Sequence, residues 1–178
     1  MQTIYYSNLS SPDTLQQLVV AAFLNKDIRT QAIAPKSVSL CLVDSALILE
    51  DPNAISYHLA KESPLLGHDL EEQTDIYSWL EYFNLQVLPL VHELYGQVFA
   101  SLPANQNKFV YALEELKKTV KVLDDQLKMR SFLVADRITL ADVIICCQLD
   151  KAFRLLITAD MRKKLCNLTR WFSHVRQT

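Results

Sequence analysis

The strongest nucleophiles in the sequence are four cysteines, and their spacing matches neither a zinc site nor a disulfide framework. Two of them are adjacent within an apolar stretch, where a free cysteine behaves as a small hydrophobic side chain. The four are Cys41, Cys146, Cys147 and Cys166. This usage indicates a reducing, cytoplasmic compartment and predicts no metal bound through thiolates.

The four histidines are scattered along the chain and form no metal-binding motif such as HExxH. They are His58, His68, His92 and His174, which we expect on the surface or in helix packing. Only two glycines occur, Gly67 and Gly96, so no glycine-rich loop can cradle a phosphate. Nucleotide-binding enzymes built on such loops are therefore excluded, and no cofactor is predicted.

The charge balance argues against a nucleic-acid partner. The 178 residues carry a formal net charge of -2, and half of them are hydrophobic. Lys117, Lys118 and Lys121 lie close together, but a domain that holds nucleic acid usually has a basic excess. The sequence MQTIYYSNLS lacks the regions of a signal peptide. The longest apolar run, Leu18 to Leu24, falls far short of the roughly 18 residues of a membrane span.

The first third of the chain alternates strand and helix patterns. Residues 3–6 (TIYY) predict a strand, and the helix that follows begins where Ser11 can cap and Pro12 fits the first turn. Four apolar residues share one face of this helix: Leu15, Leu18, Val19 and Phe23. That periodicity is typical of an amphipathic helix.

Shorter elements complete the first third. The stretch 26–35 is ambiguous, while 38–43 and 46–49 are short apolar runs that predict a hairpin. Residues 53–61 predict a short helix. Proline and glycine then interrupt the pattern over 62–69, which we interpret as a linker.

Everything after the linker is typical of helices. The amphipathic pattern over 70–99 contains Pro89, which should kink or divide it. A single apolar stripe runs through 109–127, at Phe109, Leu113, Leu116, Val120, Leu123 and Leu127. Its lysines, together with Asp124 and Asp125, are expected on solvated faces. Shorter helices are predicted over 154–157, 161–165 and 168–175.

The segment 139–149 predicts a buried central helix. Thr139 and Asp142 have the spacing of a capping box, in which a hydroxyl and a carboxylate satisfy backbone N–H groups at a helix start. The helix that they open is apolar nearly all round, as is typical of the centre of a bundle.

These features together resemble the glutathione-transferase superfamily. The segment 132–143 (FLVADRITLADV) carries most of the resemblance, with 51–60 (DPNAISYHLA) at the corresponding separation. The resemblance implies an α-rich α/β fold. Residues 1–62 would form a reduced thioredoxin-like subdomain whose second helix is shortened or missing, and 69–178 an all-helical bundle.

Within the superfamily, the chain is most similar to the N-terminal domain of the gamma subunit of eukaryotic elongation factor 1B. Arg170-Trp171-Phe172 resembles a signature near the end of that domain, although bundle closure explains these residues equally well. The resemblance implies a non-catalytic scaffold of cytosolic translation, with protein partners in an elongation-factor complex and with homodimerisation. A transferase-like appendage of an aminoacyl-tRNA synthetase complex and an active glutathione transferase remain as alternatives.

The resemblance also identifies positions where an active transferase would bind glutathione. A hydroxyl after the first strand would stabilise the thiolate, for which Tyr5, Tyr6 and Ser7 are candidates. Family members carry a cis-proline where this chain has Ser39, and an acid followed by serine where it has Asp51-Pro52. Proline offers neither a hydroxyl nor an N–H to a carboxylate. The glutathione site is therefore expected to be degraded, with no catalytic residue.

Overall fold

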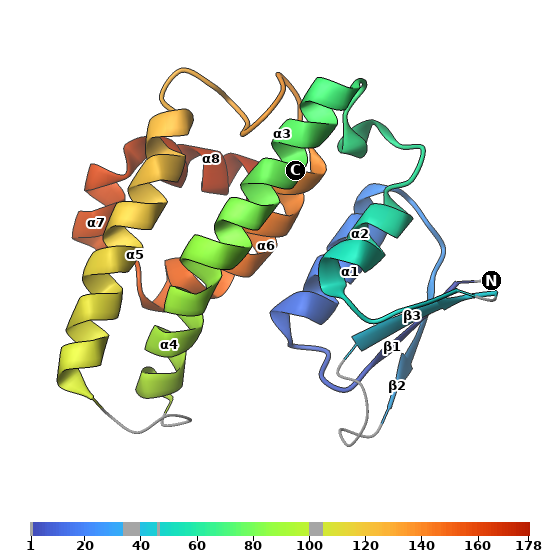
Figure 1. Cartoon of the computed structure of the whole chain (residues 1–178), viewed down its shortest axis with the longest axis horizontal. Coiled ribbons are helices and arrows are strands. Elements are labelled where there is room, and N and C mark those ends of the chain that lie inside the picture. The colour runs from blue at the N-terminus through green and yellow to red at the C-terminus, as the bar shows by residue number, and fades with distance from the viewer. Residues whose placement is uncertain (1, 34–39, 46, 100–104) are drawn as a thin grey trace.

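The computed structural model describes residues 2–33, 40–45, 47–99 and 105–178, and it has a small sheet at one end and a larger helical part at the other (Figure 1). The sheet has the strand order β2-β1-β3-β4. Strand β1 runs parallel to β2 and antiparallel to β3, and β3 pairs with β4 as a hairpin. The strands are β1 (Thr3–Tyr6), β2 (Arg29–Ala32), β3 (Leu40–Asp44) and β4 (Leu47–Leu49).

Strand β2 lies in the stretch that the sequence left ambiguous. Its residues, RTQA, are all exposed, because β2 forms an edge of the sheet. A strand with no buried side chain has no alternation of apolar and polar residues by which it could be recognised. Only residues 33–39 separate β2 from β3, so the shortened or missing second helix stays a prediction, since 34–39 are outside the described residues.

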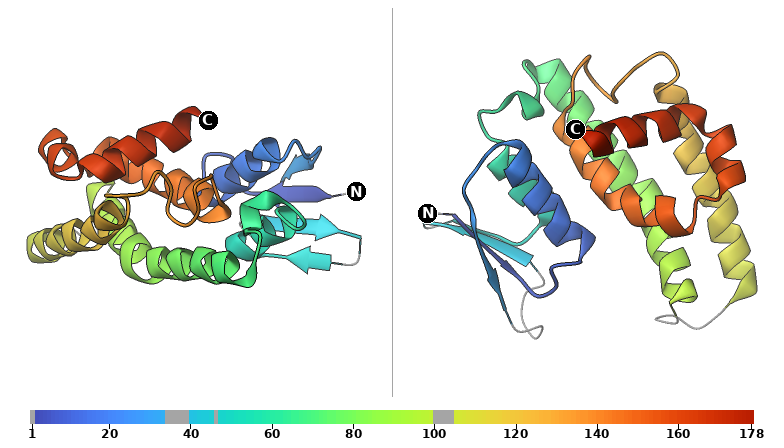
Figure 2. Two further views of the ribbon diagram at one scale, coloured as in Figure 1. Left: turned by 90° about the horizontal axis from the view of Figure 1, so that it is seen from above. Right: turned by 180° about the vertical axis from the view of Figure 1, so that it is seen from behind.

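Helices α1 (Pro12–Phe23) and α2 (Pro52–Leu59) cover the face of the sheet that is turned toward the helical part (Figure 2). The helix predicted after the first strand is confirmed, but its apolar face is not the face that it buries. Its buried residues are Thr14, Gln16, Gln17, Val20 and Ala21, whereas Leu15, Val19 and Phe23 are exposed. The glutamines can be buried because they have hydrogen-bond partners on α2 and α6. Ser11 occupies the N-cap position, but its side chain makes no capping hydrogen bond.

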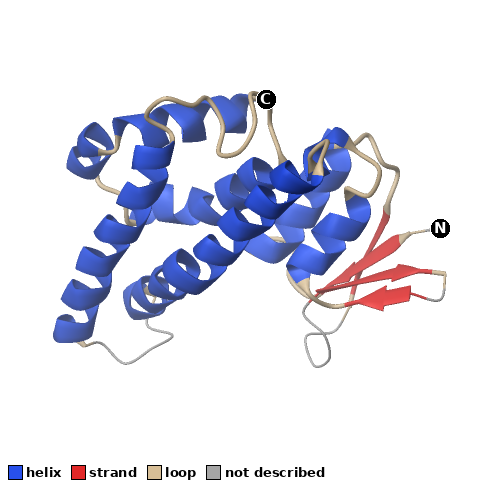
Figure 3. Cartoon of the chain, turned by 45° about the horizontal axis from the view of Figure 1, so that its top comes forward, coloured by secondary structure: helices blue, strands red, loops and turns tan. Residues whose placement is uncertain are grey.

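The helical part packs around α6, most of whose residues are buried, as the sequence predicted. Figure 3 shows the helices in blue, with the sheet in red at one end of the molecule. A 3-10 turn, Pro64–Leu66, lies in the connection from the sheet-containing part. The helices are α3 (Leu70–Tyr82), α4 (Leu88–Val98), α5 (Gln106–Gln126), α6 (Leu140–Leu155), α7 (Ala159–Lys164) and α8 (Cys166–Gln177). Residues 154–157 form no helix of their own, because α6 continues to Leu155.

The division predicted at Pro89 is confirmed. A π-helical turn over Phe83–Val87 separates α3 from α4, and Pro89 lies in the first turn of α4. A proline removes one backbone donor and its ring clashes with the carbonyl four residues earlier. That carbonyl belongs to Leu85, within the π-helical turn, so the irregularity coincides with the position that the proline disturbs.

A continuous hydrophobic core joins both parts of the molecule, from Ile4 on β1 to Trp171 on α8. Helix α5 contributes Leu116, Val120 and Leu123 to it, as the stripe predicted. In the described part of the chain, no helix is both long and apolar enough to cross a membrane.

Candidate functional site

The family resemblance places a binding contact for glutathione at the start of α2. Asp51 is the N-cap residue, and its Oδ1 accepts a hydrogen bond from the backbone N–H of Ala54 at 2.7 Å. Free N–H groups at a helix N-terminus are what would hold an anionic carboxylate. Here the carboxylate of Asp51 already occupies one of them, and Pro52 supplies none.

Pro52 contributes a carbonyl oxygen instead. It accepts a hydrogen bond from Gln17 Nε2 at 2.7 Å. The first turn of α2 is therefore fixed to α1 by intramolecular contacts. Ser39, the third position predicted to be degraded, lies outside the described residues.

These contacts extend into a group that we call the polar seam, consisting of the buried residues Gln16, Gln17, Ser56 and Gln148 and the half-buried Asp13. Ser56 Oγ accepts from Gln16 Nε2 at 2.9 Å and donates to Gln17 Oε1 at 3.0 Å. Gln148 Nε2 donates to Gln16 Oε1 at 2.8 Å and to Asp13 Oδ1 at 3.0 Å. The polar seam thus links α1 to α2 and to α6, between the sheet-containing part and the helical part.

A cavity of about 240 Å³ adjoins the polar seam, between the start of α1, α4 and α6. Its polar lining groups are His92, Tyr95, Gln148 and Lys151. The amide of Gln148 is engaged in the polar seam, and Lys151 Nζ lies 5.7 Å from the centre of the Tyr95 ring. No thiol or carboxylate lines this cavity among the described residues.

The candidate thiolate-stabilising hydroxyls lie at the end of β1. Tyr5 and Tyr6 belong to that strand, which is central in the sheet, and Ser7 follows it. Tyr6 packs against the hydrophobic core. The backbone carbonyl of Tyr6 also accepts from the N–H of Ile33, which extends the pairing with β2. Whether any of the three hydroxyls meets a thiolate stays a prediction.

Asp142 is the most enclosed carboxylate near the centre of the bundle. It accepts from the backbone N–H of Thr139 at 3.0 Å and from its hydroxyl at 2.8 Å. Two longer-range donors complete the set, the backbone N–H of Leu133 at 3.0 Å and Trp171 Nε1 at 2.8 Å. Burial raises the pKa of Asp142, and these hydrogen bonds oppose that rise.

The Arg170-Trp171-Phe172 signature is used inside the bundle. Arg170 donates to the carbonyl oxygens of Leu127 and Arg130, both at 2.8 Å. The Phe172 ring stacks on Phe153 with centroids 3.9 Å apart. Together with the bond from Trp171 to Asp142, these contacts close α8 against α5 and α6. They account for the signature without a partner.

Asp124 is a residue whose role the sequence did not reveal, since we expected it on a solvated face. Its side chain is buried, and its Oδ1 accepts from the backbone N–H groups of Asn167 and Leu168 at 2.9 Å each. Burial would raise its pKa, but hydrogen bonds from Lys121 and Leu168 lower it on balance. Asp124 thereby caps the start of α8. No local pattern could show this, because the N–H groups that it caps, those of Asn167 and Leu168, lie more than 40 residues away.

The remaining titratable groups that the structure describes form no reactive cluster. His58 Nε2 lies 3.2 Å from Asp44 Oδ2, and hydrogen bonds from Gln2 and His58 lower the pKa of Asp44. Burial raises the pKa of the Cys146 thiol to about 12 and that of Cys147 to about 11, which disfavours the nucleophilic thiolate. Within the described residues, no group of histidine, cysteine or acidic side chains could hold a metal ion.

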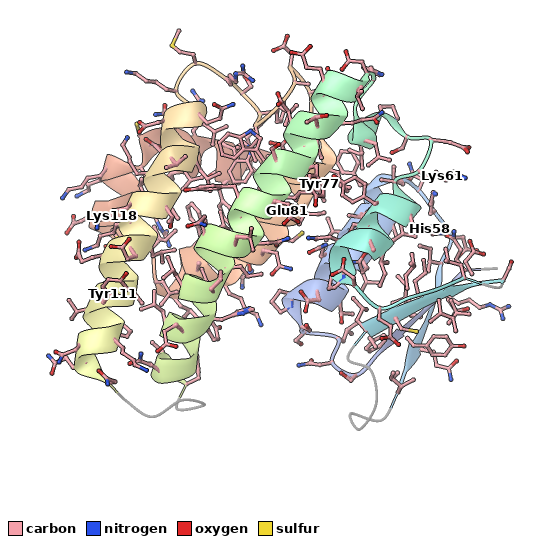
Figure 4. The ribbon with its side chains drawn as sticks, viewed as in Figure 1. His58, Lys61, Tyr77, Glu81, Tyr111 and Lys118 are labelled. Atoms are coloured by element: carbon pink, nitrogen blue, oxygen red, sulfur yellow. The ribbon has the colours of Figure 1, made fainter. Side chains whose placement is uncertain are left out.

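One face of the helices presents aromatic side chains to solvent. Figure 4 shows Tyr77 and Glu81 on α3, with Tyr111 and Lys118 on the neighbouring α5. Tyr77 is 57% exposed and Tyr111 is 67% exposed. Lys117, Lys118 and Lys121 each pair with acidic residues on α5, which makes this a solvated helix face of mixed charge.

The comparisons with known proteins agree with this geometry. Residues 81–178 match the family model described as Glutathione S-transferase, C-terminal domain. Elongation factor 1-gamma of Artemia salina is 32% identical over 124 residues, which is 70% of this chain and 29% of that protein. The Rattus norvegicus protein of the same name is 28% identical over 129 residues, 72% of this chain and 29% of its own length. The chain thus spans less than a third of these relatives.

Solved structures show the same fold. The GST-like domain of elongation factor 1-gamma from Saccharomyces cerevisiae has a TM-score of 0.89 at 23% identity, covering 99% of this chain and 89% of that one. Glutathione transferase F7 from Populus trichocarpa has a TM-score of 0.86 at 15% identity, covering 100% and 94%. Since the family model covers more than half of the chain, the protein belongs to the glutathione S-transferase family through its C-terminal domain.

Proposed function

We propose that this chain is a non-catalytic, gamma-like docking module of a translation elongation-factor complex. The observation that carries the proposal is the start of α2, where Pro52 stands in place of the serine that would hold glutathione and the carboxylate of Asp51 accepts a backbone N–H of its own helix. The similarity to elongation factor 1-gamma supports the setting in translation and therefore in the cytoplasm. The partners are proteins of that complex, and no nucleic acid or cofactor is required.

The absence of glutathione chemistry is tested with the purified chain. We expect no retention on glutathione resin and no turnover of chloro-dinitrobenzene above the uncatalysed rate. Pro52→Ser is the matched variant, because serine would restore a hydroxyl and an N–H at the start of α2. Retention or turnover by the unaltered chain would contradict the proposal and favour an active transferase.

The setting in translation is tested by affinity capture from a cell extract followed by mass spectrometry. We expect subunits of the elongation-factor complex to be enriched. Enrichment of aminoacyl-tRNA synthetases instead would support the appendage function. Tyr5→Phe, Tyr6→Phe and Ser7→Ala should each capture the same proteins, because docking uses no catalytic hydroxyl.

Self-association through the face formed by α3 and α5 is a further part of the proposal. Tyr77 and Tyr111 give this face two exposed aromatic side chains, a type enriched in interfaces. We expect a light-scattering mass of twice the 20.4 kDa chain, falling to one chain in the Tyr77→Glu/Tyr111→Glu double variant. Met129→Glu, at a fully exposed position after α5, is the control. A monomeric unaltered chain would exclude the dimer without affecting the docking proposal.

A further inference from the structure

Helix α1 has an apolar ridge that the described part of the chain leaves uncovered. Leu15, Val19 and Phe23 are 42%, 41% and 39% exposed, and they follow one another at intervals of four residues. Side chains with this spacing form a continuous ridge along a helix. The opposite side of α1 holds the glutamines of the polar seam. The apolar side of the helix therefore faces outward.

This ridge is one wall of a half-open groove of about 290 Å³. The other wall is α6, through Val143 and Cys147, and Val175 near the end of α8 completes it. The view from behind in Figure 2 shows α1, α6 and the end of α8 on the same side of the molecule. From Leu15 to Phe23 the ridge extends about 12 Å, at 1.5 Å per residue. This length suits about two turns of a second helix.

The edge of the groove along α6 and α8 is positively charged. Asp150 is shared by two arginines, with its Oδ2 2.8 Å from Arg154 Nε and its Oδ1 3.7 Å from Arg176 Nε. Lys151 also lines the groove, and it has no carboxylate partner among the described residues. In the lining of the groove, two cationic side chains, Lys151 and Arg176, therefore stand beside the carboxylate of Asp150. An occupant with acidic side chains along this edge would complement them.

We propose that the groove between α1 and α6 binds an amphipathic helix of a partner protein, whose apolar stripe contacts Leu15, Val19 and Phe23 and whose acidic side chains face Lys151 and Arg176. A helix lying in an apolar groove is a recurrent mode of peptide recognition, with anchors at three- and four-residue spacing. The inference rests on the proposed function in expecting a protein partner. It adds the surface and the chemistry of that partner.

The test is a selection of helical peptides from a displayed library on the purified chain, with Val19→Glu used for counter-selection. Enriched sequences should share apolar residues at three- and four-residue spacing, flanked on one side by Asp or Glu. By fluorescence anisotropy, a selected peptide should bind Val19→Glu at least tenfold more weakly than the unaltered chain. Lys151→Glu should weaken binding of the acidic peptide and strengthen binding of the same peptide with Lys in place of its acids.

Leu47→Glu is the matched control, because Leu47 is an equally exposed apolar residue, 41%, but lies on β4. It should bind the peptide as the unaltered chain does. Circular dichroism checks that the Val19→Glu variant is folded. If that variant is unfolded, the Leu15→Gln variant takes its place in the counter-selection and in the binding assay.

Three results would overturn the inference: no enrichment over Val19→Glu, enriched sequences without helical spacing, or a preference for basic flanks. If no helix is selected and a dansylated fatty acid binds in the groove, the groove is instead a site for small molecules that carry a carboxylate. Because the peptide assay uses neither glutathione nor a cell extract, it can fail while the docking proposal stands, and it can succeed if that proposal fails.

Discussion

At the level of single residues, Asp142 connects three separate parts of the chain. Its carboxylate accepts from Thr139 at the start of α6, from Leu133 in the preceding loop and from Trp171 on α8. A buried donor that loses its acceptor costs about 1–3 kcal/mol, more than the net worth of an ordinary hydrogen bond. Removing this carboxylate would leave several such donors at once.

Substitutions at the start of α6 should therefore lower global stability. We expect Thr139→Ala to reduce the free energy of unfolding by roughly 0.5–2 kcal/mol. Asp142→Ala should cost more, at least about 3 kcal/mol, because it leaves several buried donors unpaired. The double variant should cost less than the sum, since both residues share one set of bonds. Urea unfolding measures this, with the exposed Thr74→Ala as control. Unchanged midpoints would refute the structural role.

Glu72 on α3 should make stability depend on pH. Hydrogen bonds from Arg137 and from the backbone N–H of His68 lower the pKa of Glu72 from 4.5 to about 2. Because the pKa is lower in the folded state, the stabilisation is complete above about pH 4.5 and disappears as the pH falls toward 2. Glu72→Gln should therefore be less stable than the unaltered chain at pH 7 and nearly equal to it at pH 2.

Urea midpoints measured across this range test the prediction for Glu72. Glu71→Gln is the control, because Glu71 is exposed and is the neighbouring acid in the same helical turn. A difference between Glu72→Gln and the unaltered chain that does not change with pH would show that the ion pair with Arg137 contributes nothing.

At the level of elements, the stability of α1 should depend more on its polar side than on its apolar side. Gln16 is fully buried and bonds to Ser56 and Gln148, whereas Leu15 is 42% exposed. Gln16→Ala should cost about 1–3 kcal/mol, since buried partners are left unsatisfied. Leu15→Ala should cost clearly less. Equal costs, or the opposite order, in urea unfolding would contradict the described orientation of α1.

The elements that could be predicted are those whose cause is local in sequence. The interruption at Pro89 and the stripe of α5 depend on residues within one helix, and both are confirmed. The outward face of α1 could not be predicted, because its glutamines are satisfied only by Ser56 and Gln148. Strand β2 was missed because an exposed edge strand lacks the alternation of apolar and polar residues.

The same distinction applies to the candidate site. The cap formed by Asp51 reaches only three residues along the chain. An acid directly before a proline that starts a helix was therefore enough to indicate the cap. The buried cap that Asp124 provides for α8 joins residues 43 apart, and nothing near Asp124 indicates it.

At the level of the whole molecule, the two parts should unfold together. The hydrophobic core runs from β1 to α8, and the polar seam links α1 with both α2 and α6. We expect native-state hydrogen exchange to give β1, β3 and α6 similar free energies of opening, close to the global value. A clearly lower value for the strands would show that the sheet-containing part opens independently.

The polar seam also restricts how this protein can change during evolution. Gln16, Gln17 and Ser56 each donate and accept hydrogen bonds within the group or donate to the carbonyl of Pro52, and Gln148 donates to both Gln16 and Asp13. A single mutation to an apolar residue would leave a buried hydrogen-bond partner unsatisfied. Simultaneous replacement of all four residues by well-packed apolar residues could be tolerated. The four positions should therefore be inherited as a set, with substitutions appearing together across descendants of this chain rather than one at a time.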